Sequence, residues 1–123
     1  RIIFTDEIKA ETMPKVMSAI SLLITLPRYE GYGMTPLEAL ASGTPFVGTK
    51  TGYFEEFSSN NKYGSVVALE DIDGASEAIL NWLSKNDKLD DFSKMASKYI
   101  LNNHSVEKEV NGIIEAYISL LNN

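Results

Sequence analysis

The stretch that decides the fold is Leu26–Thr49, which reads L-P-R-Y-E-G-Y-G-M-T-P-L-E-A-L-A-S-G-T-P-F-V-G-T. An apolar run, Ser21–Leu26, ends at a proline and leads into a loop that contains Gly31 and Gly33. A helix is predicted over Thr35–Ser42, because Gly43 follows it as a stop signal and a second apolar run comes next. In open parallel sheets, ligands bind at the carboxyl ends of the strands, which is where this loop is expected to lie.

Working outward, short apolar runs alternate with stretches of helical periodicity, which is typical of a parallel α/β sheet. Strands are predicted at Arg1–Phe4, Ser21–Leu26, Pro45–Gly48 and Ser65–Leu69. Further helical segments are predicted over Glu11–Ile20, with Thr12 as a candidate N-cap, and as a single turn at Phe54–Phe57. The predicted fold class is therefore α/β, a Rossmann-like parallel sheet of about four strands with helices on both faces.

Beyond Leu69 the pattern is helical throughout, with Asp73, Asp87 and Ser105 as candidate N-caps. The side chains expected to face inward are Ala75, Ala78, Ile79, Trp82 and Leu83 in the first helix, Leu89, Phe92, Met95, Ala96 and Tyr99 in the second, and Val106, Val110, Ile113, Ile114, Tyr117 and Leu121 in the third. The aromatic residues at these spacings are expected in the core. His104 stands without a second His or Cys, so a surface or capping role is expected for it.

The composition limits the classes of protein to which the chain can belong. The 123 residues suffice for one domain, and the 11 basic residues are scattered along a chain of net charge −6, so no nucleic-acid partner is expected. The absence of cysteine excludes a disulfide framework and a Cys-based metal site. No apolar stretch reaches the roughly 18–20 residues of a bilayer-spanning helix. A cytoplasmic location is expected, with peripheral association with a membrane as an alternative for the full-length protein.

The loop and the helix start allow two interpretations. In the first, Thr35-Pro36-Leu37-Glu38 is a capping box, with Thr35 at the N-cap, Pro36 at the first helical position and Glu38 reaching back to the Thr35 amide. Glu38 would then be worth about 1 kcal/mol of helix stability and nothing more. Glu30 would be a solvated loop residue, and the glycines would only permit a turn.

In the second interpretation the same residues form a ligand site. A helix N-terminus offers unpaired N–H groups and a partial positive charge to a phosphate. Glycines let the backbone around Gly31–Met34 approach a ligand closely. Carboxylates suit vicinal diols, so Glu30 and Glu38 could hold two polyol groups with phosphate between them. A sugar, a diphosphate and a ribose would satisfy that arrangement.

The run P-R-Y-E-G-Y-G-M-T-P-L-E-A-L-A-S-G-T-P-F-V resembles the E-x7-E signature of retaining GT-B glycosyltransferases, especially the large family four. The positions that match the pattern are Pro27, Glu30, Gly31, Gly33, Pro36, Glu38, Ala39, Ala41, Gly43, Pro45 and Val47. Weaker resemblance extends over Arg1–Phe4, over Gly52 with Glu55 or Glu56, and over the terminal helices. It therefore covers essentially the whole chain, with its specificity concentrated in Pro27–Val47.

The resemblance implies transfer of a sugar, such as mannose or glucose, from a nucleotide-sugar donor to a glycan, lipid or small-molecule acceptor with retention. In such enzymes the residue matching Glu30 contacts the donor sugar, and the residue matching Glu38 holds the ribose. Glu30 is therefore the catalytic residue that the resemblance implies, although not as a nucleophile. The donor-binding residues that it implies are Glu30, Gly31, Tyr32, Gly33, Met34, Thr35 and Glu38. No metal and no cofactor beyond the nucleotide-sugar substrate are implied.

The resemblance also implies missing parts. The acceptor-binding N-terminal domain and the basic pair that grips the diphosphate lie upstream of Arg1 in the family, so residues 1–123 are expected to be most of a donor-binding C-terminal domain that is inactive alone. In a doubly wound order of 3-2-1-4-5-6, the four predicted strands would be the third to sixth. The sheet edges would be open, and would be covered by another segment or by self-association.

Three other functions are alternatives to sugar transfer. The first is a non-catalytic nucleotide- or sugar-binding module, or a scaffold domain of a larger complex. A dinucleotide-binding oxidoreductase is disfavoured, because no G-x-G-x-x-G follows a predicted strand. A two-carboxylate glycosidase remains a third alternative, but the setting of Glu38 at a helix start suits binding better than proton transfer.

Overall fold

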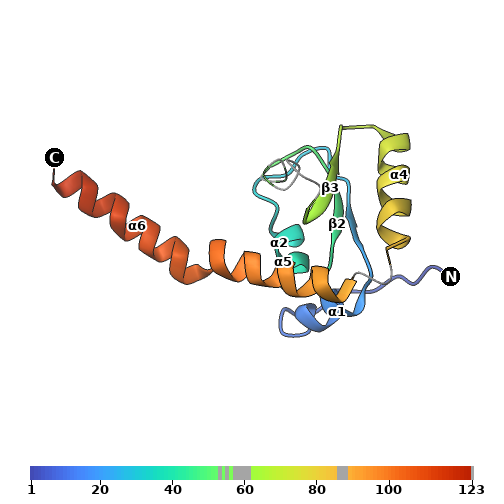
Figure 1. Cartoon of the computed structure of the whole chain (residues 1–123), viewed down its shortest axis with the longest axis horizontal. Helices are drawn as coiled ribbons and strands as arrows, with labels where there is room; N and C mark the ends of the chain where they lie inside the picture. Colours follow the sequence, from blue (N-terminus) through green and yellow to red (C-terminus); the bar gives the residue numbers. More distant parts are fainter. Residues whose placement is uncertain (53, 55, 57–61, 86–88, 123) are drawn as a thin grey trace.

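The computed structural model of the chain describes residues 1–52, 54, 56, 62–85 and 89–122. Its elements, in chain order, are α1 (Met13–Ala19), β1 (Leu23–Thr25), α2 (Met34–Ala41), β2 (Phe46–Thr49), β3 (Gly64–Val67), α4 (Ile72–Leu83), α5 (Leu89–Asn103) and α6 (Val106–Leu121). The three strands form a parallel sheet in the order β1-β2-β3 (Figure 1). The predicted α/β class is confirmed, and three of the four predicted strands are present.

The core lies on both sides of β2. All four residues of β2 are buried, as expected for a strand that is covered on both faces. Helices α2 and α4 lie on opposite faces of the sheet, and α5 packs along α2 (Figure 1). On the α4 side, the buried indole of Trp82 donates to the Ser65 hydroxyl at 3.0 Å, which fixes the helix to β3. The fully buried side chains with the largest volumes are Phe46, Phe54, Leu40, Val47 and Pro36.

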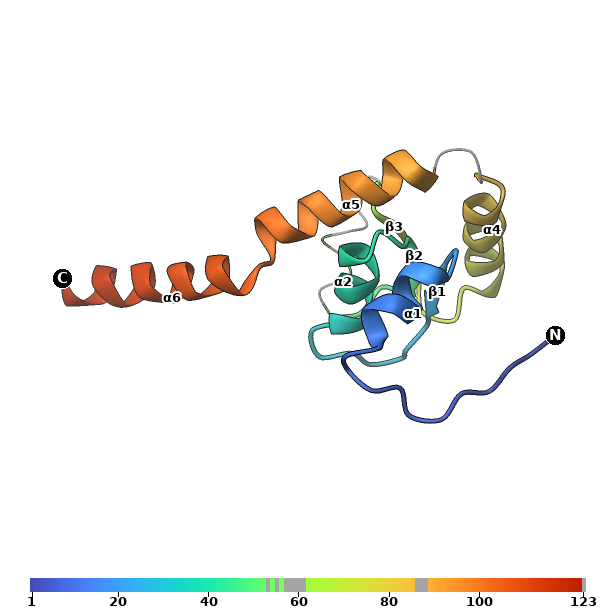
Figure 2. The ribbon, with the colours of Figure 1, turned by 90° about the horizontal axis from the view of Figure 1, so that it is seen from below.

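The predicted strand at Arg1–Phe4 is wrong for this structure. The segment forms neither helix nor strand, and Ile2 and Phe4 are 83% and 93% exposed. Figure 2 shows it running along the outside of the body, away from the sheet. A strand needs a neighbour to pair its backbone N–H and C=O groups, and within the described residues none of the three strands pairs with this segment.

Helix caps agree with the sequence in part. Ser105 caps α6 as predicted, since its side chain accepts from the N–H of Lys108 at 3.3 Å. The cap of α4 is Asp71, whose carboxylate accepts from the Gly74 N–H at 2.9 Å, so the prediction of Asp73 is wrong. Asp73 lies in the first turn instead. The predicted Asp87 cap lies outside the described residues, as does part of the predicted turn at Phe54–Phe57.

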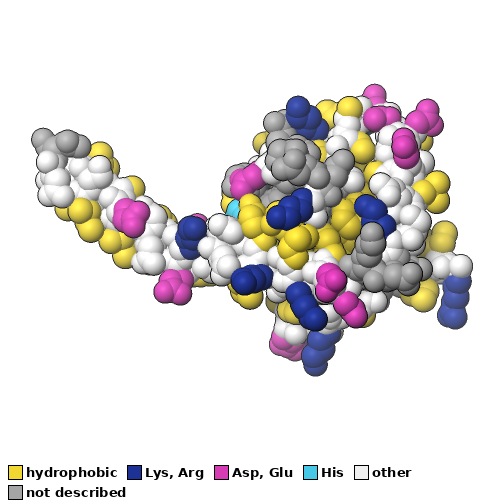
Figure 3. Space-filling view, viewed as in Figure 1, with side chains coloured by type: hydrophobic (Ala, Val, Ile, Leu, Met, Phe, Trp, Pro, Cys, Tyr) yellow, Lys and Arg dark blue, Asp and Glu magenta, His cyan; other side chains and the backbone are white. Residues whose placement is uncertain are grey.

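Helix α6 extends away from the body and buries none of its residues (Figures 1 and 3). The sequence prediction that its apolar side chains face inward is therefore wrong. The exposed members of that prediction are Val106, Val110, Ile113, Ile114, Tyr117 and Leu121. The periodicity identified an apolar face, but the described residues supply nothing for that face to pack against. Across the described ranges no helix is long and apolar enough to cross a membrane.

Candidate functional site

The loop between β1 and α2 ends at Gly33, which is the N-cap of the helix. Gly33 has φ +95°, a left-handed conformation that glycine adopts at little cost. Helix α2 begins at Met34, so Thr35 is its second residue and Glu38 lies one turn further in. The predicted capping box is wrong, because no side chain caps α2 within the described residues. The first N–H groups of α2 therefore lack a side-chain acceptor and form the positive end of the helix dipole.

The two glutamates of the signature lie in different surroundings. Glu30 is partly buried, and its Oε1 accepts the N–H of Gly31 at 3.1 Å. The Gly31 amide is thus occupied by the neighbouring carboxylate, so in this structure it does not face a ligand as the second interpretation expected. Glu38 is exposed on the surface of α2. Of the remaining candidates, Gly33 is buried, whereas the other four are exposed; these are Gly31, Tyr32, Met34 and Thr35.

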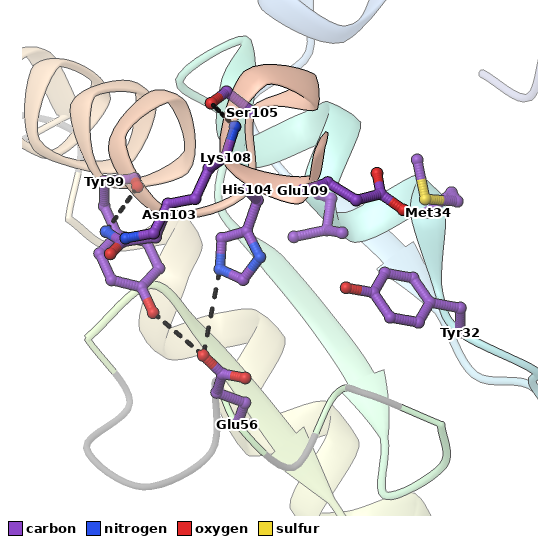
Figure 4. A pocket seen from close by; sticks show the side chains of 10 residues that line it. Tyr32, Met34, Glu56, Tyr99, Asn103, His104, Ser105, Lys108 and Glu109 are labelled. Atoms are coloured by element: carbon purple, nitrogen blue, oxygen red, sulfur yellow. Dashed lines mark hydrogen bonds and ion pairs between the residues drawn. The ribbon is translucent and has the colours of Figure 1, made fainter. Parts of the chain in front are cut away.

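A cavity of about 690 Å³ lies beside the start of α2, between this loop and the junction of α5 with α6 (Figure 4). It is lined by Tyr32, Met34, Leu37, Glu56, Tyr99, Asn103, His104, Ser105, Lys108 and Glu109. Of the seven predicted site residues, Tyr32 and Met34 line this cavity and the other five do not. The cavity therefore adjoins the predicted donor site rather than coinciding with it.

Three polar side chains of this cavity form a cluster that the sequence analysis did not identify. The Tyr99 hydroxyl donates to Oε1 of Glu56 at 3.3 Å, and Nε2 of His104 lies 4.0 Å from the same oxygen (Figure 4). Burial, followed by the charge of Glu56, raises the pKa of Tyr99 above its ordinary value. The Tyr63 ring stacks on Tyr99 with centroids 4.3 Å apart.

The surface role expected of His104 is wrong, because only 10% of its side chain is exposed. The reason is its position at the junction between α5 and α6, where the chain turns and the imidazole is enclosed. The Ser105 cap was the sequence signal for that junction. Glu56 is distant in sequence, and nothing in the sequence indicated that it would approach.

A second cavity, of about 680 Å³, lies where the three strands end. Its lining includes Leu26 after β1, Thr49 at the end of β2 and Val67 at the end of β3, together with residues of α4. An ion pair between Arg28 and Glu70 (3.0 Å) lies at this cavity, but both side chains are largely exposed, so it is worth little in stability. Within the described part of the chain, no group of three His, Cys, Asp or Glu residues is placed to hold a metal ion.

The family described as glycosyl transferases group 1 matches residues 1–99, which is most of the chain and includes the whole β1–α2 loop. The chain belongs to this family. The three-stranded parallel sheet with helices on both faces is consistent with part of the Rossmann-like domain of such a protein.

Similar curated proteins include two mannosyltransferases. A lipopolysaccharide core biosynthesis mannosyltransferase of Rhizobium meliloti is 30% identical over 98% of this chain, which covers 34% of that protein. Another protein of that description, from Rhizobium leguminosarum bv. viciae, is 32% identical over 83% of the chain and 29% of its own length. A mannosylfructose-phosphate synthase of Agrobacterium fabrum is 40% identical over 42% of the chain. The chain thus spans about a third of the length of the first two relatives.

Proposed function

We propose that the full-length protein transfers a hexose, such as mannose, from a nucleotide-sugar donor to an acceptor with retention at the anomeric carbon. Residues 1–123 would supply most of the donor-binding C-terminal domain. Turnover would need an N-terminal domain, which binds the acceptor, so this segment alone would be inactive. Two relatives are described as mannosyltransferases of lipopolysaccharide core biosynthesis, which favours mannose as the sugar and a cell-envelope glycan as the acceptor.

The observation that carries the proposal is the start of α2. The left-handed Gly33 turns the chain so that the helix begins directly at Met34, with no side-chain cap within the described residues. Exposed N–H groups at a helix N-terminus bind phosphate oxygens through hydrogen bonds and the helix dipole. Such donors also stabilise the charge that develops on a departing diphosphate.

The two glutamates would bind the polyol groups on either side of the diphosphate. Glu38, exposed one turn into α2, would accept hydrogen bonds from the ribose hydroxyls. Glu30 would contact the hydroxyls of the donor sugar, after exchanging its contact with the Gly31 N–H (3.1 Å) for one with the substrate. Glu30 would bind and orient the sugar rather than attack it, and no metal ion would be required.

The test uses the full-length protein with GDP-mannose and UDP-glucose, measuring nucleoside diphosphate release and the anomeric configuration of the product. Replacing Glu38 or Glu30 by Gln removes hydrogen bonds to a charged group, so kcat/KM should fall by about 10- to 100-fold. Glu77→Gln, at an exposed position of α4, is the matched control and should leave kcat/KM unchanged. Turnover should persist in EDTA.

Undiminished turnover by both Glu30→Gln and Glu38→Gln would overturn the site assignment. Binding of GDP or UDP without transfer from any donor would favour the alternative of a non-catalytic binding module. Inversion of the anomeric configuration would contradict the retaining mechanism alone.

A further inference from the structure

The β1–α2 loop lies against the chain that follows β2, and the Phe54 ring lies beside Gly33. A Cβ atom placed on Gly33 would lie 2.1 Å from Cε1 of Phe54, so the ring occupies the space that any side chain at position 33 would need. Phe54 is fully buried, and its ring packs edge-on against Phe46 with centroids 5.8 Å apart. It also lies close under Gly48, where an added Cβ would be 2.9 Å from Cδ2 of the ring. The ring therefore has little freedom to move away from Gly33.

Gly52 lies close to the preceding part of the loop. A Cβ at this position would lie 3.2 Å from the carbonyl oxygens of Gly31 and Tyr32, and 3.3 Å from Cγ of Glu30. Gly52 also has φ +55°, which L side chains rarely adopt. At the start of the loop, the Thr49 hydroxyl donates to the carbonyl of Pro27. The loop thus lies close to three residues at or after the end of β2, which are Thr49 beside Pro27, Gly52 beside Glu30 and Phe54 beside Gly33.

We propose that Phe54 and Gly52 are positioning residues for donor binding. Phe54 fixes the left-handed turn at Gly33, which aims the first N–H groups of α2, and Gly52 leaves room for the Glu30 side chain beside the loop. Neither residue is assigned a contact with the donor. The inference rests on the proposed function, because the loop matters to donor binding only if it holds the donor. Small displacements of a positioned group cost large factors in rate, of the order of 100-fold for about 1 Å.

Two variants of the full-length protein test the inference, each with a matched control. Phe54→Leu removes the ring edge beside Gly33, and its control is Phe92→Leu. Phe92 is also a buried phenylalanine, and its ring packs edge-on against Trp82 with centroids 5.1 Å apart. Gly52→Ala adds a methyl group against the loop, and its control is Gly112→Ala, where an added Cβ meets nothing within 4 Å. Thermal unfolding is measured for all four variants. Donor KM, acceptor KM and kcat are then measured at a temperature where each variant is folded.

We expect Phe54→Leu and Gly52→Ala to lower kcat/KM for GDP-mannose or UDP-glucose, whichever donor is used, by about tenfold or more. Donor KM should rise while acceptor KM stays unchanged. Phe92→Leu should lower the unfolding temperature as much as Phe54→Leu does, yet keep donor KM within about twofold of the original. Because Gly52 is exposed, its variant keeps the test valid if Phe54→Leu does not fold.

Calorimetric titration with GDP and UDP separates this inference from the function on which it rests. If Glu38→Gln loses nucleotide affinity while Phe54→Leu and Gly52→Ala keep the donor KM of the unmodified protein, the positioning role is wrong and the donor site stands. If Glu38→Gln binds both nucleotides as the unmodified protein does, the donor site itself is wrong, and the positioning role fails with it.

Discussion

The sequence predicts both α2 and α6, α2 from its start and stop residues and α6 from apolar periodicity, but the two helices differ in burial. In α2 the apolar residues Leu37 and Leu40 are buried in the core. In α6 no residue is buried, and its apolar side chains are exposed along the helix (Figure 3). Periodicity sets which face of a helix is apolar, whereas burial depends on a partner. The sheet and α5 supply that partner for α2, and the described residues supply none for α6.

The largest expected effect that tests this contrast is on stability. Leu40→Ala removes a side chain with 0% exposure, so the free energy of unfolding of the chain should fall by about 2–5 kcal/mol. Leu120→Ala makes the same change on α6 at 74% exposure and should cost less than about 0.5 kcal/mol. Urea denaturation followed by circular dichroism measures both. Equal losses would contradict the exposed position of α6.

Replacing each of two glycines by alanine should change the stability of the chain in opposite directions. Gly43 ends α2 with φ +83°, and an added Cβ would lie 1.8 Å from Oγ of Ser93 in α5, so Gly43→Ala should destabilise the chain by about 1–3 kcal/mol. Gly112 lies inside α6 with nothing within 4 Å of an added Cβ, so Gly112→Ala should stabilise that helix by about 0.5–1 kcal/mol. Thermal unfolding midpoints show whether each variant is more or less stable than the unmodified chain. A loss of stability in Gly112→Ala would mean that α6 packs closely against another part of the chain.

The sequence determined what is local in this fold. The parallel sheet, the helix after the glycine loop and the Ser105 cap follow from apolar runs and from cap and stop residues, and they are present. Arg1–Phe4 has the composition of a strand, but strand formation needs a pairing neighbour that local sequence cannot supply. The inward orientation expected of α6 failed for a related reason, since burial requires a surface elsewhere.

The candidate site shows the same limit of local sequence at the level of single residues. Pattern alone placed Glu30, Gly33 and Glu38 around a helix start, but it assigned the cap to Thr35 where the structure has Gly33. A capping box needs Thr35 as the N-cap, whereas in the structure the N-cap is the left-handed Gly33, which lies against the Phe54 ring. That contact spans residues far apart in the chain, so no local rule would have found it.

The smallest expected effect concerns pH at the junction of α5 and α6. Burial and Glu56 raise the pKa of Tyr99 in the folded chain, so its contribution to stability is fully present below the unfolded tyrosine pKa of about 10 and is lost as pH rises through the folded value. Tyr99→Phe should therefore show a shallower loss of stability than the unmodified chain as the pH rises above about 10. Identical slopes in the two proteins would contradict the environment described for Tyr99.

Nucleotide titration of the full-length protein tests the central claim most directly. The claim is that the exposed start of α2, with Glu38 one turn inside it, binds the nucleotide part of the donor. Calorimetry with GDP and UDP should give binding of one of them, with Glu77→Gln unchanged and Glu38→Gln weakened by about tenfold or more, as expected for lost hydrogen bonds to a charged group. Binding by Glu38→Gln as tight as that of the unmodified protein would contradict the account.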